Sequence, residues 1–592
     1  MPRLTTFVLS HRRLVVAAWF VLLVAGMVGA GRVSDRLSID FSMPGQPGSS
    51  TASEITRIYG NGGGQPPAIL VATVPSGQTV AADQARIAAA FDAARTQVQG
   101  LRIVDYATTK DTRFITGDGR STYALVFAPL PHTFMPSPLI DQAKAAAAAS
   151  LGSAGTVALT GMQQLATGDT DQGTGVLAET LVGAAGALVI LAFVFGSFLA
   201  LLPLLIAAVS ITSTLLVVLL LTTFTDVSFV VEFLVALVGL GVAIDYSLLV
   251  VTRWREERAA GRDNDSAIRA AMTTAGRAVM FSGITVGIGL LGLVILPVPG
   301  LRSVGFGGML IPVVSVAVTL TLLPAILAGA GRRLDWPRHK AEGRASRVWT
   351  AWGRIVVRRR ALAAGAALVV LGVLIAPVFG LRVGMTGVDA LASSGSAYTA
   401  YHQLLDSGVP AGVLTPLEVL VQSSDATAVA GRLASVPGIV TVAQAAGPDS
   451  NRDGTTVLLA IPQDATVDSA STAPVDAARN AVDGMPGVVG IAGVGAIELD
   501  YIHAVIDDFP LMLGVIALLT FLLLARAFRS ILLPAKAVVL NLLSLSAIFG
   551  LITWFWQDGH GSNALFGVAP TGALTFWVPL MIIAFLFGLS MD

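Results

Sequence analysis

Residues 241–253 of the chain read GVAIDYSLLVVTR, which places one carboxylate, Asp245, inside an otherwise apolar run. Asp245 lies eight residues before Arg253, so a helical rise of about 1.5 Å per residue puts it roughly 12 Å inside the end of the run. An Asp at the centre of a membrane-spanning helix costs about 2.5–3.5 kcal/mol, and such residues usually mark functional sites. The alternative is an Asp that a neighbouring helix holds only to fix the packing.

The composition indicates that this run is one of several membrane spans. Hydrophobic residues make up 54% of the 592-residue chain and charged residues 12%, against about a quarter in soluble proteins. A span needs about 20 apolar residues. We expect such spans at 14–30, 176–194, 199–222, 228–252, 278–298, 304–330, 361–379, 509–525, 531–556 and from 576 to the end.

The first apolar run, within residues 1–30, is interpreted as a membrane span. No small-x-small cleavage pattern follows Ala30, so a cleavable signal peptide is the weaker interpretation. Lys plus Arg and Asp plus Glu balance at 37 each, which gives no indication of a nucleic-acid partner. The chain contains no Cys, which excludes disulfides and thiolate metal sites.

Arginine-rich loops indicate the orientation in the membrane. One follows the fourth predicted span, and a second basic loop covers residues 331–360 after the sixth. Because basic loops stay in the cytoplasm, both place the N-terminus inside and segments 31–175 and 380–508 outside. The basic loop is also compatible with contacts to anionic lipid headgroups.

Both external segments predict an α+β domain. In segment 31–175 we expect strands at 68–74, 122–127 and 157–160, and helices at 80–98 and 137–150. In segment 380–508 we expect strands at 417–422, 439–443, 455–461 and 488–492, and helices at 425–434 and 473–483.

The two halves of the chain repeat the same organisation: one span, one external segment, then a block of spans. Gly241-Val-Ala-Ile-Asp245 in the fourth span (block 176–330) corresponds to Gly588-Leu-Ser-Met-Asp592 in the tenth (block 509–592). Such parallel repeats are typical of transporters. Symmetry predicts twelve spans, of which about ten are present, so we expect a protein that continues beyond Asp592.

The repeat brings the two acidic residues into one hypothesis. Asp245 and Asp592, on helices related by pseudosymmetry, are expected to face the interior of the bundle and exchange protons there. The hydroxyl of Tyr246 can both donate to and accept from a carboxylate. Gly241 and Gly588 are expected to allow close helix packing near this relay.

The stretch Gly-Val-Ala-Ile-Asp-Tyr-Ser followed by Arg253-Trp-Arg-Glu-Glu257 resembles the fourth-helix motif of the MMPL family. Gly276–Gly283, Leu322–Leu327 and Phe587–Asp592 resemble the same family. The resemblance implies a polytopic α-helical membrane protein of the resistance-nodulation-division (RND) superfamily, with two pseudo-repeats and two external α+β porter-like domains. It also implies export of lipids, glycolipids or hydrophobic compounds across the bacterial plasma membrane, driven by the proton-motive force.

In that family an Asp-Tyr pair on the fourth helix hydrogen-bonds to an Asp-Tyr pair on the tenth. Asp245, Tyr246 and Asp592 match this pattern, whereas the second Tyr would be residue 593. The fifth-helix Ser of the family corresponds to Ser282, and Thr285 is a second candidate closer in depth to Asp245. A hydroxyl that bonds only its own helix backbone is the alternative for Ser282.

Other features favour plain interpretations. Asp500-Tyr501 is expected to repeat the Asp-Tyr dipeptide by chance, before the eighth span, and Glu179 and Glu232 to be solvated. The six His residues show no metal-ligand spacing, and Gly62–Gly64 resemble a phosphate loop without the Lys that ATP binding needs. We therefore expect a transporter, not an enzyme, without cofactor or metal. The alternatives are a lipid-sensing protein that does not pump, or an inactive fragment.

Overall fold

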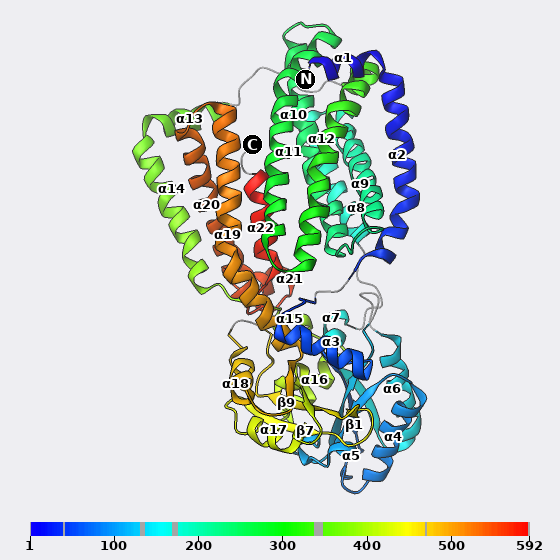
Figure 1. Ribbon diagram of the computed structural model, residues 1–592. Helices are drawn as coiled ribbons and strands as arrows, with labels where there is room; N and C mark the ends of the chain where they lie inside the picture. The colour runs from blue at the N-terminus through cyan, green and yellow to red at the C-terminus, as the bar shows by residue number, and fades with distance from the viewer. Residues whose placement is uncertain are drawn as a thin grey trace.

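The computed structural model describes residues 2–38, 42–130, 137–168, 176–336, 347–467 and 470–589. A bundle of long helices forms one end of the molecule, and an α/β body forms the other (Figure 1). The N-terminal helix α1 (Pro2–Ser10) lies at the end of the bundle that faces away from this body.

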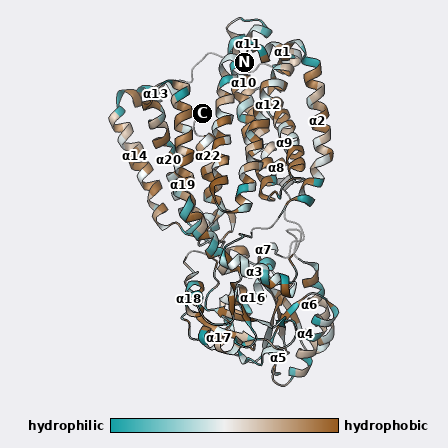
Figure 2. Ribbon diagram, in the orientation of Figure 1, coloured by the Kyte–Doolittle hydropathy of each residue, from teal (hydrophilic) through white to brown (hydrophobic). Residues whose placement is uncertain are grey.

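Ten apolar helices correspond to the ten predicted spans. Within the described residues eight helices are long and apolar enough to cross a membrane, and two shorter apolar helices accompany them. Their surfaces are hydrophobic along most of the bundle (Figure 2), which makes this a multi-pass membrane protein. The ten are α2 (Arg12–Val33), α8 (Val176–Phe195), α9 (Leu201–Leu221), α10 (Val230–Ala259), α11 (Asn264–Leu291), α12 (Pro299–Leu334), α14 (Arg360–Ile375), α19 (Val494–Phe528), α20 (Leu532–Ile552) and α22 (Trp577–Leu589).

The first sheet comes from the segment between α2 and α8 and has the antiparallel order β2-β3-β1-β4. Alternate side chains of its central strand point to opposite faces: Leu70 packs in a cluster with helices α4 and α6, and Ile69 packs in a cluster on the other face. Its elements are β1 (Ala68–Thr73), β2 (Arg102–Val104), β3 (Ser121–Phe127), β4 (Thr156–Thr160), α4 (Gln84–Gln97) and α6 (Pro138–Leu151).

The second sheet has the order β10-β6-β9-β7 and comes from the segment between α14 and α19. Val419 faces the covering helices, whereas Leu420 joins the cluster that contains Ile69 of the first sheet. Its elements are β6 (Leu417–Gln422), β7 (Ile439–Gln444), β9 (Thr455–Pro462), β10 (Val488–Ala492), α17 (Ala426–Leu433) and α18 (Ala473–Val482), with the short β8 (Asn451–Arg452) beside β9. The two sheets therefore share one hydrophobic cluster between them, while each sheet also has a cluster of its own under its covering helices.

A buried ion pair joins the two sheets at their shared core. The guanidinium of Arg102, on β2, bonds the carboxylate of Glu418, on β6, and neither side chain is exposed to more than 1%. Asn61 accepts a hydrogen bond from Arg102 at 3.0 Å, and the backbone N–H of Gly63 donates to Glu418 at 2.6 Å. Gly62 has a φ of 73°, and a side chain there would overlap Arg102. The glycines that resemble a phosphate loop thus fit around this ion pair.

The start of the eighth span differs from its prediction. The apolar run begins near residue 509, but α19 begins at Val494, directly after β10. Asp500 therefore lies within this helix, where it accepts a bond from Arg479 at 2.8 Å and one from the backbone N–H of Gly48 at 2.7 Å. Gly48 lies in α3 (Pro47–Tyr59), a helix of the first segment. The Asp500 carboxylate thus joins two distant parts of the chain.

Further helices were not predicted. α16 (Ser396–Asp406) belongs to the second segment, yet its Gln403 donates to Thr73 of β1 at 3.0 Å. Within the basic loop 331–360, α12 continues to Leu334 and α13 (Arg347–Arg358) forms an amphipathic helix with exposed Trp349 and Trp352.

We predict that Glu418→Gln strongly destabilises the protein. The substitution leaves the Arg102 guanidinium buried without its counter-charge, which typically costs about 3–5 kcal/mol. Urea unfolding of the purified protein, followed by its circular dichroism, measures this change. The control is Glu54→Gln, which removes an exposed partner of Arg57 and should change the stability little. Equal effects of the two substitutions would contradict the role of the buried pair.

Candidate functional site

Helix α10 carries the acidic residue of the predicted site. Asp245 is half-buried, and the neighbouring Tyr246 is fully buried. The aromatic ring of Tyr246 packs in a hydrophobic cluster with residues such as Val250 and Val279. In the described part of the chain, Asp245 has no hydrogen bond and no ion pair with another side chain. A carboxylate is thus held inside an apolar bundle next to a buried hydroxyl.

Hydroxyl and backbone carbonyl groups form a polar row from α10 to α22 along helix α11. The Ser282 hydroxyl donates to the Tyr246 hydroxyl at 3.2 Å, and both side chains are buried. One turn further, Thr285 donates to the backbone carbonyl of Ser282 at 2.7 Å and lies 3.4 Å from the carbonyl oxygen of Gly588. The structure therefore brings together Tyr246, Ser282, Thr285 and Gly588.

Two small residues let α11 and α22 approach backbone to backbone. A side chain at Gly588 would overlap the backbone of Val286, and a side chain at Gly289 would overlap the carbonyl oxygen of Ala584. Glycine at such positions allows close packing of membrane helices. These contacts hold the tenth helix of the repeat against the fifth helix, directly beside Thr285.

An amide that was not predicted bonds α22 from helix α20. Asn541 of α20 is 5% exposed, and its Nδ2 donates to the carbonyl oxygen of Phe587 at 3.0 Å. A side-chain amide within an apolar span is costly unless it is bonded. The signal in the sequence is this single Asn within the run LLPAKAVVLNLLSLSAIFGLI, and it identifies a polar position close to the predicted site.

The remaining acidic site residue and the first of the two predicted packing glycines are Asp592 and Gly241. Asp592 lies outside the described residues, so its approach to Asp245 stays a prediction. Gly241 is exposed, and among the described residues nothing lies within 4 Å of a Cβ atom placed there. Among the described residues Gly241 therefore makes no close helix contact, and its expected packing role stays a prediction.

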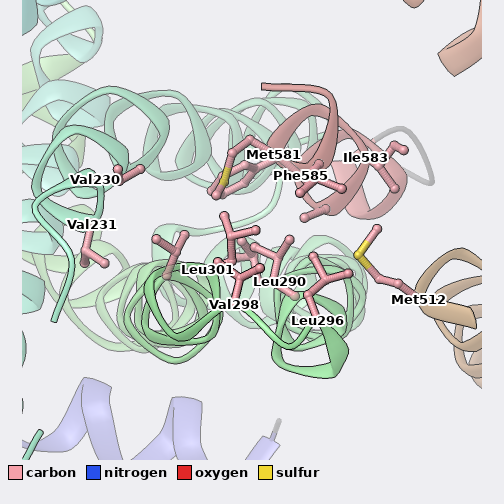
Figure 3. Close-up of a cluster of buried hydrophobic side chains, with 14 of the residues drawn as sticks. Val230, Val231, Leu290, Leu296, Val298, Leu301, Met512, Met581, Ile583 and Phe585 are labelled. Carbon is pink, nitrogen blue, oxygen red and sulfur yellow. The ribbon is translucent and has the colours of Figure 1, made fainter. Parts of the chain in front are cut away.

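The surroundings of α22 are apolar. Met581, Ile583 and Phe585 belong to a cluster that also contains Leu290 and Leu296 (Figure 3). This cluster also includes residues of α10, α12 and α19, so α22 is packed into the bundle on several sides. In the described residues, no group of three or more His, Asp or Glu side chains could hold a metal ion.

The MMPL sequence profile matches residues 40–362 and 418–570, which is most of the chain. The chain belongs to the MMPL family. The mycolic acid-containing lipids exporter MmpL11 of Mycolicibacterium smegmatis is 34% identical over 68% of this chain and 44% of its own length. The trehalose monomycolate exporter MmpL3 of Mycobacterium tuberculosis is 32% identical over 74% of this chain and 51% of its own.

Other relatives extend this comparison. The membrane protein YdfJ of Bacillus subtilis is 26% identical over 99% of this chain and 81% of its own length. Among solved structures, the hedgehog release protein Disp of the water bear Hypsibius dujardini has a TM-score of 0.47 at 13% identity, over 79% of this chain and 66% of its own. The chain spans about half the length of the two mycobacterial relatives.

We predict that Gly289→Leu separates α11 from α22. The larger side chain must displace the backbone at Ala584, and overpacking of this kind costs about 1–3 kcal/mol. The melting temperature of the detergent-solubilised protein should fall. Gly241→Leu is the matched control, because the position has open space and should leave the melting temperature unchanged. A stable Gly289→Leu variant would contradict the close contact.

Proposed function

We propose that this protein exports lipids or similar hydrophobic molecules across the bacterial plasma membrane and uses the proton-motive force as its energy source. The family and the names of its relatives support the transport of such molecules. Another relative is named a heme uptake protein, and heme is also a large and mostly apolar molecule. The cargoes that these names give are therefore all hydrophobic. The sequence carries no motif for direct ATP use, so the proposal names the proton-motive force as the energy source.

The observation that carries the proposal is the half-buried Asp245 beside the hydrogen-bonded hydroxyls of Tyr246 and Ser282. Hydroxyl groups both donate and accept, so a row of them can pass a proton between a carboxylate and another group. Asp245 is the proton acceptor in this proposal, and Tyr246 and Ser282 form the hydrogen-bonded part of the path. Thr285, whose hydroxyl bonds the backbone carbonyl of Ser282, is the next hydroxyl in the direction of α22. Asp592 is its expected partner on the tenth helix.

Proton binding neutralises the Asp245 carboxylate in an apolar environment. In this proposal, the change of charge drives the conformational change of the protein. A charged carboxylate favours water and polar partners, whereas a neutral one tolerates apolar packing. The two states therefore favour different positions of α10 and α11 against α22. Because α22 packs against α19, which continues into the α/β body, such a shift reaches the part of the molecule that would handle the cargo.

The proposed orientation places the N-terminus in the cytoplasm and the α/β body outside. Basic residues near the last turns of α10 (Arg253, Arg255, Arg258) and along α13 lie at the end of the bundle opposite to this body (Figures 1 and 2). Arginine-rich ends of membrane helices stay on the cytoplasmic side. Cargo would thus be released at the side of the shared β-sheet core.

We expect Asp245→Asn to abolish transport that depends on a proton gradient. The amide keeps the size of the side chain but cannot release a proton, and Tyr246→Phe should reduce the rate by interrupting the path to Ser282. Proteoliposomes with an imposed pH gradient and a fluorescent lipid measure both effects.

The matched control is Glu232→Gln, at the outer end of α10, where the carboxylate accepts a bond from Ser34 at 2.8 Å. This variant should transport at the normal rate. If Asp245→Asn still transports in a gradient-dependent manner, the relay is wrong. If the unmodified protein binds lipid but never moves it, a lipid sensor is the better description.

A further inference from the structure

A cavity of about 850 Å³ opens at the end of the bundle that faces the α/β body. It lies between the end of α9, the start of α10 and the start of α12, and Ser38 and Pro44 border it on the side of α2. Its volume falls within the range of about 300–1,000 Å³ that is typical of sites for small molecules. None of the groups of the proposed proton path lines this cavity.

The lining changes from apolar to polar along the direction of the helices. Val217 in α9, and Phe306 and Leu310 within α12, line the part toward the centre of the bundle, and Leu220 lies one turn nearer the end of α9. Asp226 and Ser228, beyond the end of α9, and Arg302 in the first turns of α12 line the part toward the α/β body. An amphiphile fits this gradient with its chain beside the spans and its headgroup at their ends.

Two opposite charges occupy the polar end. Arg302 uses its Nε to donate to the carbonyl oxygen of Leu296 at 2.7 Å, and its side chain is exposed. Asp226 is exposed as well. In the described ranges neither residue takes part in an ion pair. Arg302 can therefore bind an anionic group of a ligand, and Asp226 can bind a cationic group.

We propose that this cavity binds a zwitterionic aminophospholipid of the outer leaflet. Arg302 binds the phosphate, Asp226 binds the ammonium group, and an acyl chain lies against Leu220, Phe306 and Leu310. Arginine is well suited to phosphate because its planar guanidinium presents several N–H donors. The idea that cargo lipid enters the transporter at this cavity rests on the proposed function. The idea that the cavity binds a lipid depends only on the residues that line it.

The test measures binding without a proton gradient. The protein is placed in nanodiscs that contain phosphatidylethanolamine and phosphatidylglycerol, and a phosphatidylethanolamine with a photoreactive acyl chain is cross-linked to it. Cross-links are expected on the peptides that contain Leu220 and Phe306. Leu220→Trp, which narrows the cavity at the end of α9, should reduce them, whereas Leu533→Trp, at an exposed apolar position of α20, should not.

Charge substitutions then test the headgroup. Losing one charged hydrogen bond lowers binding by about tenfold. Arg302→Gln should lower the retention of both lipids by this factor, and Asp226→Asn should lower only that of phosphatidylethanolamine. Equal losses of the two lipids in Asp226→Asn, or cross-links unchanged by Leu220→Trp, would overturn the proposal. Asp245→Asn should bind lipid normally. If the unmodified protein binds lipid at this cavity but does not pump it, the proposed function is refuted while the lipid site stands.

Discussion

The contact between α11 and α22 is the constraint on which the membrane part of the structure depends. Two residues without side chains, Gly289 and Gly588, allow the helix backbones to meet. Because α11 belongs to the first repeat and α22 to the second, this contact joins the two halves inside the apolar bundle. It also sets the position of the Gly588 carbonyl beside Thr285, and thereby the geometry of the polar row that starts at Tyr246.

Outside the bundle the halves are joined by a different interaction. The sheets share one apolar core, and within it Arg102 and Glu418 neutralise one another. A buried pair of this kind adds little net stability compared with apolar residues, but its loss on one side is costly. It therefore fixes one relative arrangement of the two sheets. Gly62 and Gly63 leave room for it, and Asn61 satisfies a donor of Arg102.

The sequence predicted elements better than their assembly. The strand at 417–422 matches β6, because alternating apolar residues and turn signals are local properties. The start of α19 was missed because residues 494–508 include Asp500, Asp507 and Asp508, and hydropathy detects spans rather than helices. The pairing of Arg102 with Glu418 joins residues 316 positions apart, which no local pattern reveals. The link from Tyr246 to Ser282 was expected only through the family resemblance, and Asn541 was not recognised at all.

Helix α19 has a mechanical consequence. Its 35 residues extend for about 52 Å at the usual helical rise, from the edge of the second sheet through the bundle (Figure 1). Near its start, Asp500 ties it to α3 of the first segment. An unbroken helix of this kind behaves as a stiff rod, although Pro510 gives it one point where it can bend. A tilt of the membrane end of α19 would therefore displace the α/β body. Bending of the helix at Pro510 would reduce this displacement.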